Sequence, residues 1–337
     1  MAQTDDLPLS DALPLAEAAA TSAPRRGLLK HPLLRVVLVL VLVGGVGYTL
    51  WLSFQDPQLA DFAWHFYPVP IGIGLLLMLS TSLSTSLLWL VIFRSLGGRV
   101  ETRPGCRIYM VTNLGKYLPG KVMHAAGRVA LLQERRQPAS IVVTSVLVEL
   151  VLSLMGAALL SLIAVPGLLR QPGFAEHATL LTIISLLALP AGLIGLHPRV
   201  MGPVLKLASR MLPSRAGELC TDLPPYRTTL LLLVSYMLLW FVMSMGLFAT
   251  AHTVYPLEWD RLPGMAGIAA ISYLFGLAVP IAPAGIGARE GLMTALLSTL
   301  MPMPLPAAAV ASVLYRVVTI VGESLAAGLG ILLDRER

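Results

Sequence analysis

The chain has 337 residues, of which 56% are apolar and only 12% are charged, and its formal net charge is +6. In soluble domains about 25% of the residues are charged, so this composition excludes a water-soluble globular protein. It predicts instead an all-α polytopic membrane protein. In such a protein basic residues set orientation in the membrane, so we expect no nucleic-acid partner.

Residues 1–34 are predicted to be an N-terminal tail with a basic flank. The first 24 residues are acidic and rich in Ala, Ser, Thr and Pro, a composition that cannot form a core and favours disorder. Arg25, Arg26 and Lys30 follow, and an apolar run then extends from Val36 to Phe54. No small-residue cleavage pattern follows this run, so we expect a retained first helix rather than a removed signal.

Eight apolar runs are candidates for crossing the bilayer, because a span needs about 20 residues. They lie at 36–54, 68–93, 141–165, 178–196, 229–252, 264–282, 286–303 and 306–333. The run at 286–303 is short and opens with polar residues, so both a short span and one arm of a re-entrant hairpin stay open. The predicted organisation is therefore a transmembrane domain at 35–333 and a short C-terminal tail at 334–337.

The basic residues are distributed very unevenly between the loops. All but three of the 24 lysine and arginine residues lie in the N-terminal flank, the stretches 94–136 and 199–227, at position 289 or at the C-terminus; the exceptions are Arg170, Arg261 and Arg316. Lysine and arginine accumulate in cytoplasmic loops. This bias predicts a multi-pass protein of the cytoplasmic (inner) membrane with both termini in the cytoplasm.

Two cysteines, Cys106 and Cys220, lie in separate polar stretches. They are too few for a disulfide scaffold or a zinc site. We expect neither a metal nor a cofactor.

The stretch 104–133 is the first place where the apolar pattern breaks. Pro119 and Gly120 interrupt it, which predicts two short helices separated by a turn, the second beginning near Lys121. Lys121, His124 and Arg128 then share one face of that helix. A helix N-terminus with two nearby cations is suited to bind phosphate, although an amphipathic helix resting on anionic headgroups explains the same charges.

The second break lies at 278–290, where two prolines and two glycines separate apolar runs. The chain resumes with Arg289 and Glu290 in the first turn of the next helix. This arrangement is typical of the discontinuous helices of transporters, whose exposed N-termini face anions. Irregular backbone at membrane depth persists mainly where it lines a cavity, which favours this interpretation over a plain turn.

The last run carries a polar stripe on one helix face, formed by Ser312, Arg316, Thr319 and Glu323. An unpaired arginine inside a span costs at least ~3 kcal/mol, so Arg316 needs a partner. Glu149 is the other acid deep in an apolar run. We therefore expect either a Glu149–Arg316 pair or a phosphate site shared by both, with a purely structural ion pair as the alternative.

The pattern NLGKYLPGKV at 113–122, the later Gly127-Arg128 and the segment PIAPAGIGARE at 280–290, with Arg316 in the final helix, resembles the lysyl-phosphatidylglycerol synthase transmembrane (flippase-like) family. The resemblance covers roughly 35–333. It implies an eight-helix flippase region that, in bifunctional members, precedes a cytoplasmic aminoacyl transferase domain; this chain is expected to lack that domain. Members of the family are associated with aminoacylated phospholipids, polyprenyl-linked sugars and hopanoid-related lipids.

The residues that match the family pattern fall in both breaks. They are Gly115, Lys116, Tyr117, Pro119, Gly120 and Arg128 in the first, and Pro283, Gly285, Gly287, Arg289 and Glu290 in the second. Met123 and His124 depart from the pattern, and the sequence therefore leaves the headgroup open.

The resemblance and the charges together predict a translocase that moves an anionic or modified phospholipid, or a polyprenyl-linked lipid, across the membrane. The candidate substrate-binding residues are Lys116, Tyr117, Lys121, His124, Arg128, Arg289, Glu290 and Arg316, and the candidate intramembrane or coupling charges are Glu149 and Glu323. Two alternatives stay open: a membrane-embedded transferase or phosphatase using His124 and Glu149, and a non-catalytic partner of a lipid- or glycolipid-synthesis enzyme. The sequence does not decide whether the protein is an enzyme, but the expected lack of a transferase domain favours a transporter.

Overall fold

The computed structural model describes residues 67–117, 123–170, 178–209, 219–220, 223–279, 285, 287–301 and 303–335. The predicted tail at 1–34, the first apolar run and Lys121 lie outside these residues. The described part is helical, without strands, and its α-helices are α3 (Pro68–Ser95), α4 (Thr102–Asn113), α5 (Met123–Gln133), α6 (Ala139–Ser161), α7 (Val165–Leu169), α9 (Ala178–Gly195), α10 (Pro198–Ser209), α11 (Tyr226–Val254), α12 (Leu262–Ala278), α13 (Ala288–Leu300) and α14 (Leu305–Arg335). Short 3₁₀ turns are η4 (Leu114–Tyr117), η5 (Leu162–Ala164) and η7 (Trp259–Arg261).

Within the described residues, five helical segments are long and apolar enough to cross a membrane. They are Pro68–Ser95, Ala139–Leu169, Tyr226–Val254, Trp259–Ala278 and Leu305–Leu332. Each coincides with a predicted apolar run, which confirms the all-α polytopic membrane fold. In lipid, the backbone N–H and C=O groups of a helix form their hydrogen bonds within the helix. In α3 the hydroxyls of Ser80 and Ser86 do the same, since each donates to the carbonyl three residues earlier, at 2.8 and 2.7 Å.

The predicted run at 286–303 is shorter in the structure than a span. It becomes α13, which has 13 residues. At 1.5 Å per residue this helix is about 20 Å long, against a hydrocarbon core of about 30 Å. Of the two interpretations left open by the sequence, the structure favours the re-entrant arm.

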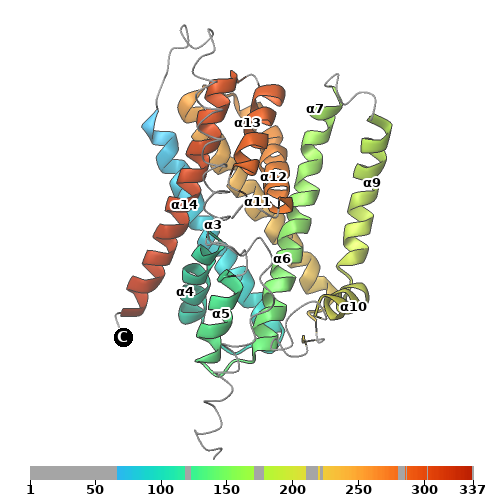
Figure 1. Ribbon diagram of the computed structural model, residues 1–337, viewed down its shortest axis with the longest axis vertical. Helices are drawn as coiled ribbons and strands as arrows, with labels where there is room; N and C mark the ends of the chain where they lie inside the picture. Colours follow the sequence, from blue (N-terminus) through green and yellow to red (C-terminus); the bar gives the residue numbers. More distant parts are fainter. Residues whose placement is uncertain are drawn as a thin grey trace, which may run out of the picture. The chain divides into compact units, whose positions relative to one another are not determined.

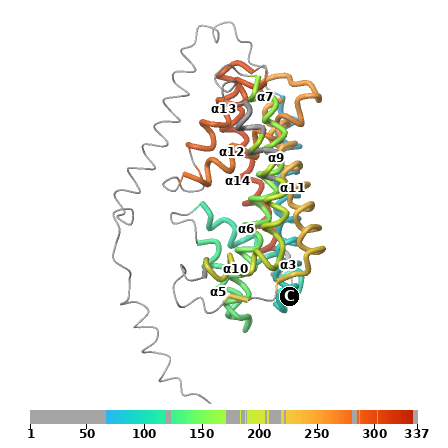
Figure 2. The backbone as a smooth tube through the Cα atoms, turned by 90° about the vertical axis from the view of Figure 1, so that its right-hand side faces the viewer, coloured from blue at the N-terminus to red at the C-terminus, as the bar shows by residue number. Residues whose placement is uncertain are grey.

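The structure confirms broken helices at both predicted places, and each break joins two helices that pack against each other. The hairpin of α4 and α5 lies in the lower half of Figure 1, and the hairpin of α12 and α13 lies in the upper half. Figure 2 shows both hairpins on the same side of α3 and α11, one above the other. The two hairpins therefore approach each other from opposite ends of the helical bundle.

Glycines close both hairpins. A Cβ on Gly115 would lie 2.8 Å from the backbone nitrogen of His124, and a Cβ on Gly276 would lie 2.9 Å from Cβ of Arg289. Gly285 and Gly287 have φ of 74° and 86°, a region that L side chains rarely adopt. These glycines let the chain reverse with the two arms in contact.

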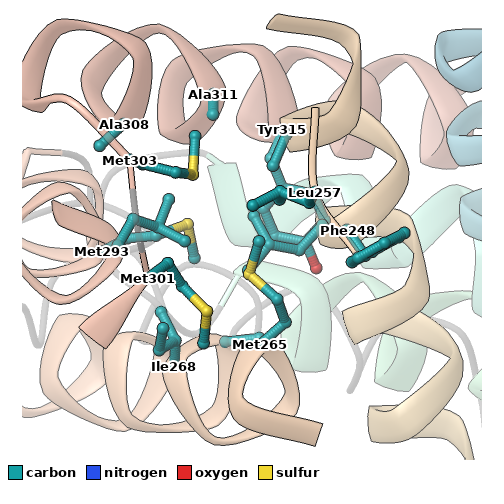
Figure 3. Close-up of a cluster of buried hydrophobic side chains, with 14 of the residues drawn as sticks. Phe248, Leu257, Met265, Ile268, Met293, Met301, Met303, Ala308, Ala311 and Tyr315 are labelled. Atoms are coloured by element: carbon teal, nitrogen blue, oxygen red, sulfur yellow. The ribbon is translucent and has the colours of Figure 1, made fainter. Parts of the chain in front are cut away.

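The core combines close helix approach with adaptable side chains. A Cβ on Gly246 of α11 would lie 2.3 Å from Cε of Met78 in α3, so the end of this methionine would have to move to admit it. The same hydrophobic cluster is rich in methionine around α12 and α13. Figure 3 shows Met265, Met293, Met301 and Met303 packed with Leu257 and Phe248. Methionine fills irregular gaps, which suits the packing of a short hairpin against long helices.

Candidate functional site

A cavity of about 380 Å³ lies where the two hairpins meet, within the size range of small-ligand sites. Its walls come from α3, α4, η4, α5, α6, α11, α12, α13 and α14. The charged residues that line it are Lys116, Arg128, Glu149, Arg289, Arg316 and Glu323. Buried charge persists in a membrane helix only where it is paired or faces a polar cavity, and this cavity provides both conditions.

Arg128 of α5 and Glu149 of α6 form the most enclosed ion pair of the cavity. Nη1 of Arg128 lies 2.8 Å from Oε2 of Glu149, and the arginine side chain is only 1% exposed. The Tyr109 hydroxyl donates a hydrogen bond to the other carboxylate oxygen. The guanidinium carbon stands 4.2 Å from the ring centre of Tyr109 and 4.8 Å from that of Trp89, so two aromatic faces add cation–π attraction.

The expected Glu149–Arg316 pair is wrong. Glu149 pairs with Arg128, whereas Nε of Arg316 lies 3.6 Å from Oε1 of Glu290. Helical periodicity identified the faces that carry these charges, but the partner found for each charge among the described residues comes from one of the two short hairpins. Glu149 and Arg316 nevertheless line the same cavity, so the alternative of a shared site stays open.

Glu323 of α14 holds the turn of the first hairpin. Nζ of Lys116 donates to Oε1 of Glu323 at 2.6 Å, and the Tyr117 hydroxyl donates to Oε2 at 2.9 Å. The side chain of Lys116 is 35% exposed, against 11% for Glu323. Among the described ion-paired cations of the cavity, Lys116 is therefore the most exposed.

The polar stripe of α14 faces both hairpins. Ser312 and Thr294 of α13 share a hydroxyl–hydroxyl hydrogen bond of 2.9 Å, and Arg316 faces Glu290 of the same helix. Further along, Glu323 reaches η4. Three residues of the predicted stripe thus contact the two broken elements, whereas the fourth, Thr319, donates a hydrogen bond to the Tyr315 carbonyl within α14.

Glu290 has a structural task in the second hairpin. Its Oε2 accepts a hydrogen bond of 2.7 Å from the backbone N–H of Gly287 and so caps the start of α13. Its side chain does not line the cavity directly. Glu290 instead connects the turn of the hairpin to Arg316.

Arg289 differs from the other cations of the cavity, because the described residues include no carboxylate partner for it. It is 6% exposed, and among the described residues no acid lies within ion-pair distance of it. Its guanidinium carbon lies 5.5 Å from the ring centres of both Tyr273 and Tyr315, and its Nη2 has no hydrogen-bond partner in the described part. The sequence analysis counted Arg289 with the basic loop residues, whereas the structure buries it in the wall of the cavity.

Most of the predicted site residues come together. Lys116, Tyr117, His124, Arg128, Glu149, Arg289, Arg316 and Glu323 all line the cavity. Lys121 lies outside the described residues. Sequence reasoning missed Tyr109, Tyr273 and Tyr315, which cover the arginines, because single tyrosines in apolar helices carry no periodic signal.

The charges of this region do not cancel. Among the described residues, four cations lie at the cavity or in its ion pairs: Lys116, Arg128, Arg289 and Arg316. Three carboxylates accompany them: Glu149, Glu290 and Glu323. The net charge of this group of residues is therefore +1. No group of three or more metal-ligating His, Cys, Asp or Glu side chains occurs in the part of the chain that the structure describes. The cavity is thus suited to receive an anion.

These features define the chain as a polytopic α-helical membrane protein in which two broken helical elements enclose a charged cavity. The model of one family, the lysylphosphatidylglycerol synthase TM region, matches residues 33–327. The chain therefore belongs to that family, as the motifs in its two breaks indicated. No individually curated protein matches it.

Proposed function

We propose that the protein is a lipid translocase that binds an anionic headgroup between its two hairpins. The observation that carries this proposal is the surplus buried cation Arg289 in a cavity lined by paired charges. A buried, incompletely hydrogen-bonded guanidinium is costly on its own and favours an anionic ligand, for which its fork of donors is well matched. Membership of a lipid-associated membrane family supports the same function.

The geometry divides the predicted phosphate ligands into two groups. Arg128 is enclosed by Glu149, Trp89 and Tyr109, so we assign it a positioning task. Arg289 has no carboxylate within ion-pair distance among the described residues, and Arg316 lines the same cavity. We therefore assign phosphate binding to Arg289 and Arg316, with Lys116 at the more exposed side of the cavity.

A lipid-modifying enzyme is less well supported by the same cavity. The enzymatic alternative needs Glu149 or His124 to exchange a proton with a substrate. Both carboxylate oxygens of Glu149 already accept hydrogen bonds, one from Tyr109 and one from Arg128. Protein donors therefore already occupy both oxygens that the acid–base mechanism would need, which favours translocation.

The direct test is lipid flipping by the purified full chain in vesicles that contain acyl-labelled phosphatidylglycerol, read by quenching of the outer leaflet. Vesicles with protein should lose the inner-leaflet fluorescence much faster than empty vesicles. Arg289→Gln should slow this by about tenfold or more, because a charge-assisted hydrogen bond contributes about 1.5–3 kcal/mol. The matched control is Arg261→Gln, since Arg261 is 44% exposed and pairs only loosely with Asp260 at 3.5 Å.

No acceleration over empty vesicles for phosphatidylglycerol, phosphatidylethanolamine and a polyprenyl phosphate would refute the translocase. If Arg289→Gln and Arg261→Gln slow lipid flipping equally, the protein is still a translocase but Arg289 has no specific part in its mechanism.

A further inference from the structure

The short helix α10 exposes apolar side chains although another of its faces already packs against the core. Figure 1 shows α10 at the lower end of α9, in the half of the structure that holds the α4–α5 hairpin. Met201 is only 2% exposed and belongs to a hydrophobic cluster with side chains of α6 and α11. On a neighbouring face, Val200, Val204 and Leu207 are 38%, 57% and 60% exposed. Core packing therefore does not account for these three side chains.

The corner between α9 and α10 is fixed by polar and aromatic contacts. The backbone N–H of Arg199 donates to Nδ1 of His197 at 3.2 Å, at the start of α10. The ring centres of His197 and Tyr226 lie 4.9 Å apart, and the Tyr226 hydroxyl donates to the Leu193 carbonyl at 3.0 Å. These contacts hold the start of α10 against the end of α9 and the start of α11.

The length of α9 indicates the depth at which α10 begins. α9 covers most of the apolar run predicted at 178–196 and has 18 residues, none of them charged. It is therefore about 27 Å long, close to the thickness of about 30 Å of the hydrocarbon core. A helix that follows such a segment directly begins where the hydrocarbon core meets the lipid headgroups.

Basic residues lie beside the exposed apolar face of α10. Arg199 and Lys206 are exposed and, being seven residues apart, share one side of the helix. Each directly precedes one of the apolar residues, so the basic side is turned by about 100° from the apolar face. Arg227 is exposed at the start of α11, and α10 itself contains no Asp or Glu. A helix with adjacent apolar and basic sides is typical of helices that lie in the membrane interface.

We propose that α10 lies in the lipid–water interface and binds anionic phospholipid, as a second lipid site apart from the cavity. Val200, Val204 and Leu207 contact the upper parts of the acyl chains, while Arg199 and Lys206 hold phosphate groups. The described residues of α10 are not among those that line the cavity between the hairpins. The site therefore does not depend on whether the protein translocates lipid.

Fluorescence quenching on the purified full chain, in vesicles of phosphatidylcholine and phosphatidylglycerol, tests the position of α10. In a background with Cys106→Ser and Cys220→Ser, an environment-sensitive fluorophore is attached to Val204→Cys. Pro203→Cys is the matched control, because it is exposed on the basic side one residue away. A nitroxide high on the acyl chain should quench the label at 204 several-fold more than the label at 203, and aqueous iodide should show the opposite order.

Two outcomes would overturn this position of α10. One is equal quenching of both labels by the lipid nitroxide. The other is protection of the label at 204 from both quenchers, which is expected if a second copy of the chain or another protein covers this face. Leu207→Cys and Lys206→Cys provide a second pair for the same comparison if either of the first variants does not fold.

The basic side has a test of its own, in which phosphatidylglycerol and phosphatidylcholine carry the same nitroxide-labelled acyl chain. A basic residue near the surface enriches anionic lipid about fivefold, so phosphatidylglycerol should quench the label at Val204→Cys more strongly at equal mole fraction. Arg199→Gln with Lys206→Gln should bring the ratio close to one. Arg103→Gln with Arg135→Gln is the matched control, since both arginines are exposed on other turns, and should leave the ratio unchanged. A ratio close to one before any charge is removed would refute anionic lipid binding.

The surface site and the translocase can fail separately. Arg289→Gln alters the proposed headgroup site in the cavity and should leave the lipid ratio at Val204→Cys unchanged. A loss of the ratio in this variant would show that the signal depends on the cavity and would overturn a separate site. Enrichment of phosphatidylglycerol at α10 without flipping of any lipid would retain the surface site and refute the translocase.

Discussion

At the scale of single residues, the cavity contains two kinds of arginine. Arg128 is enclosed by a carboxylate and two aromatic rings, whereas Arg289 has two aromatic rings and no carboxylate among the described residues. Both are almost fully buried, at 1% and 6% exposure. The same residue type is therefore held by a carboxylate in one hairpin, whereas in the other we propose that it binds the ligand.

Glu149→Gln should strongly destabilise the protein. It leaves the guanidinium of Arg128 buried without its counter-charge, and breaking a buried pair costs about 3–5 kcal/mol. Thermal unfolding in detergent should show a clear drop in melting temperature. Asp260→Asn is the control, since its exposed pair with Arg261 contributes at most about 1 kcal/mol; similar melting of both variants would contradict the structural assignment of Arg128.

A second residue-scale prediction concerns Glu323. Glu323→Gln removes the counter-charge of Lys116 but keeps an acceptor for Tyr117, so it frees the accessible cation of the cavity. We expect phosphatidylglycerol to bind several-fold tighter, by about 1 kcal/mol, with a steeper dependence on salt. Unchanged binding measured at two ionic strengths would show that Lys116 does not face the ligand.

At the scale of elements, the two hairpins depend on glycine contacts rather than on long helices. Gly115 lies against the backbone of His124, and Gly276 lies against Gly285 and Arg289. Each contact sits beside a residue that lines the cavity. The backbone packing of a hairpin therefore sets the position of its charged side chains.

Gly276→Ala should open the second hairpin. Its Cβ would lie 2.9 Å from Cβ of Arg289, and overpacking of this kind costs about 1–3 kcal/mol. We expect both a lower melting temperature and weaker lipid binding. The control is Gly291→Ala, whose new Cβ meets nothing within 4 Å. This substitution should leave stability unchanged or raise it by up to about 1 kcal/mol. Equal melting temperatures and equal lipid binding of the two variants would exclude a packing role for Gly276.

At the scale of the whole molecule, α14 connects the two hairpins. It contacts α13 through Ser312 and Arg316 and reaches η4 through Glu323. The hairpins otherwise enter from opposite ends of the bundle (Figure 1). In the proposed function, a headgroup at Arg316 would compete with the Glu290 contact of the second hairpin, and one at Lys116 would compete with the Glu323 contact of the first.

The predicted orientation is also a property of the whole chain. The charge bias predicts both termini in the cytoplasm, and this orientation would place the turn after α5 on the cytoplasmic side and η7 on the opposite side. In a background with Cys106→Ser and Cys220→Ser, a membrane-impermeant maleimide should label Trp259→Cys in intact cells, and Arg135→Cys only after permeabilisation. The reverse labelling pattern would invert the topology.

Much of the fold was predictable because a lipid environment restricts what a chain can do. Long apolar runs predicted the spanning helices, and Pro and Gly clusters predicted both breaks. The site was predictable in its members but not in its pairs. Arg128 and Arg289 resembled loop charges because each follows a polar break, and only the hairpin fold shows that they are buried.

The sequence by itself determined the membrane class, the two breaks and the helix faces that carry Glu149, Arg316 and Glu323, because hydropathy and helical periodicity are local properties of the chain. Only the tertiary structure decided that Glu149 pairs with Arg128, that Arg316 faces Glu290 and that Arg289 has no described carboxylate. Periodicity specifies which side of a helix is polar but not which neighbour lies opposite. That choice depends on how the two short hairpins pack between the long helices.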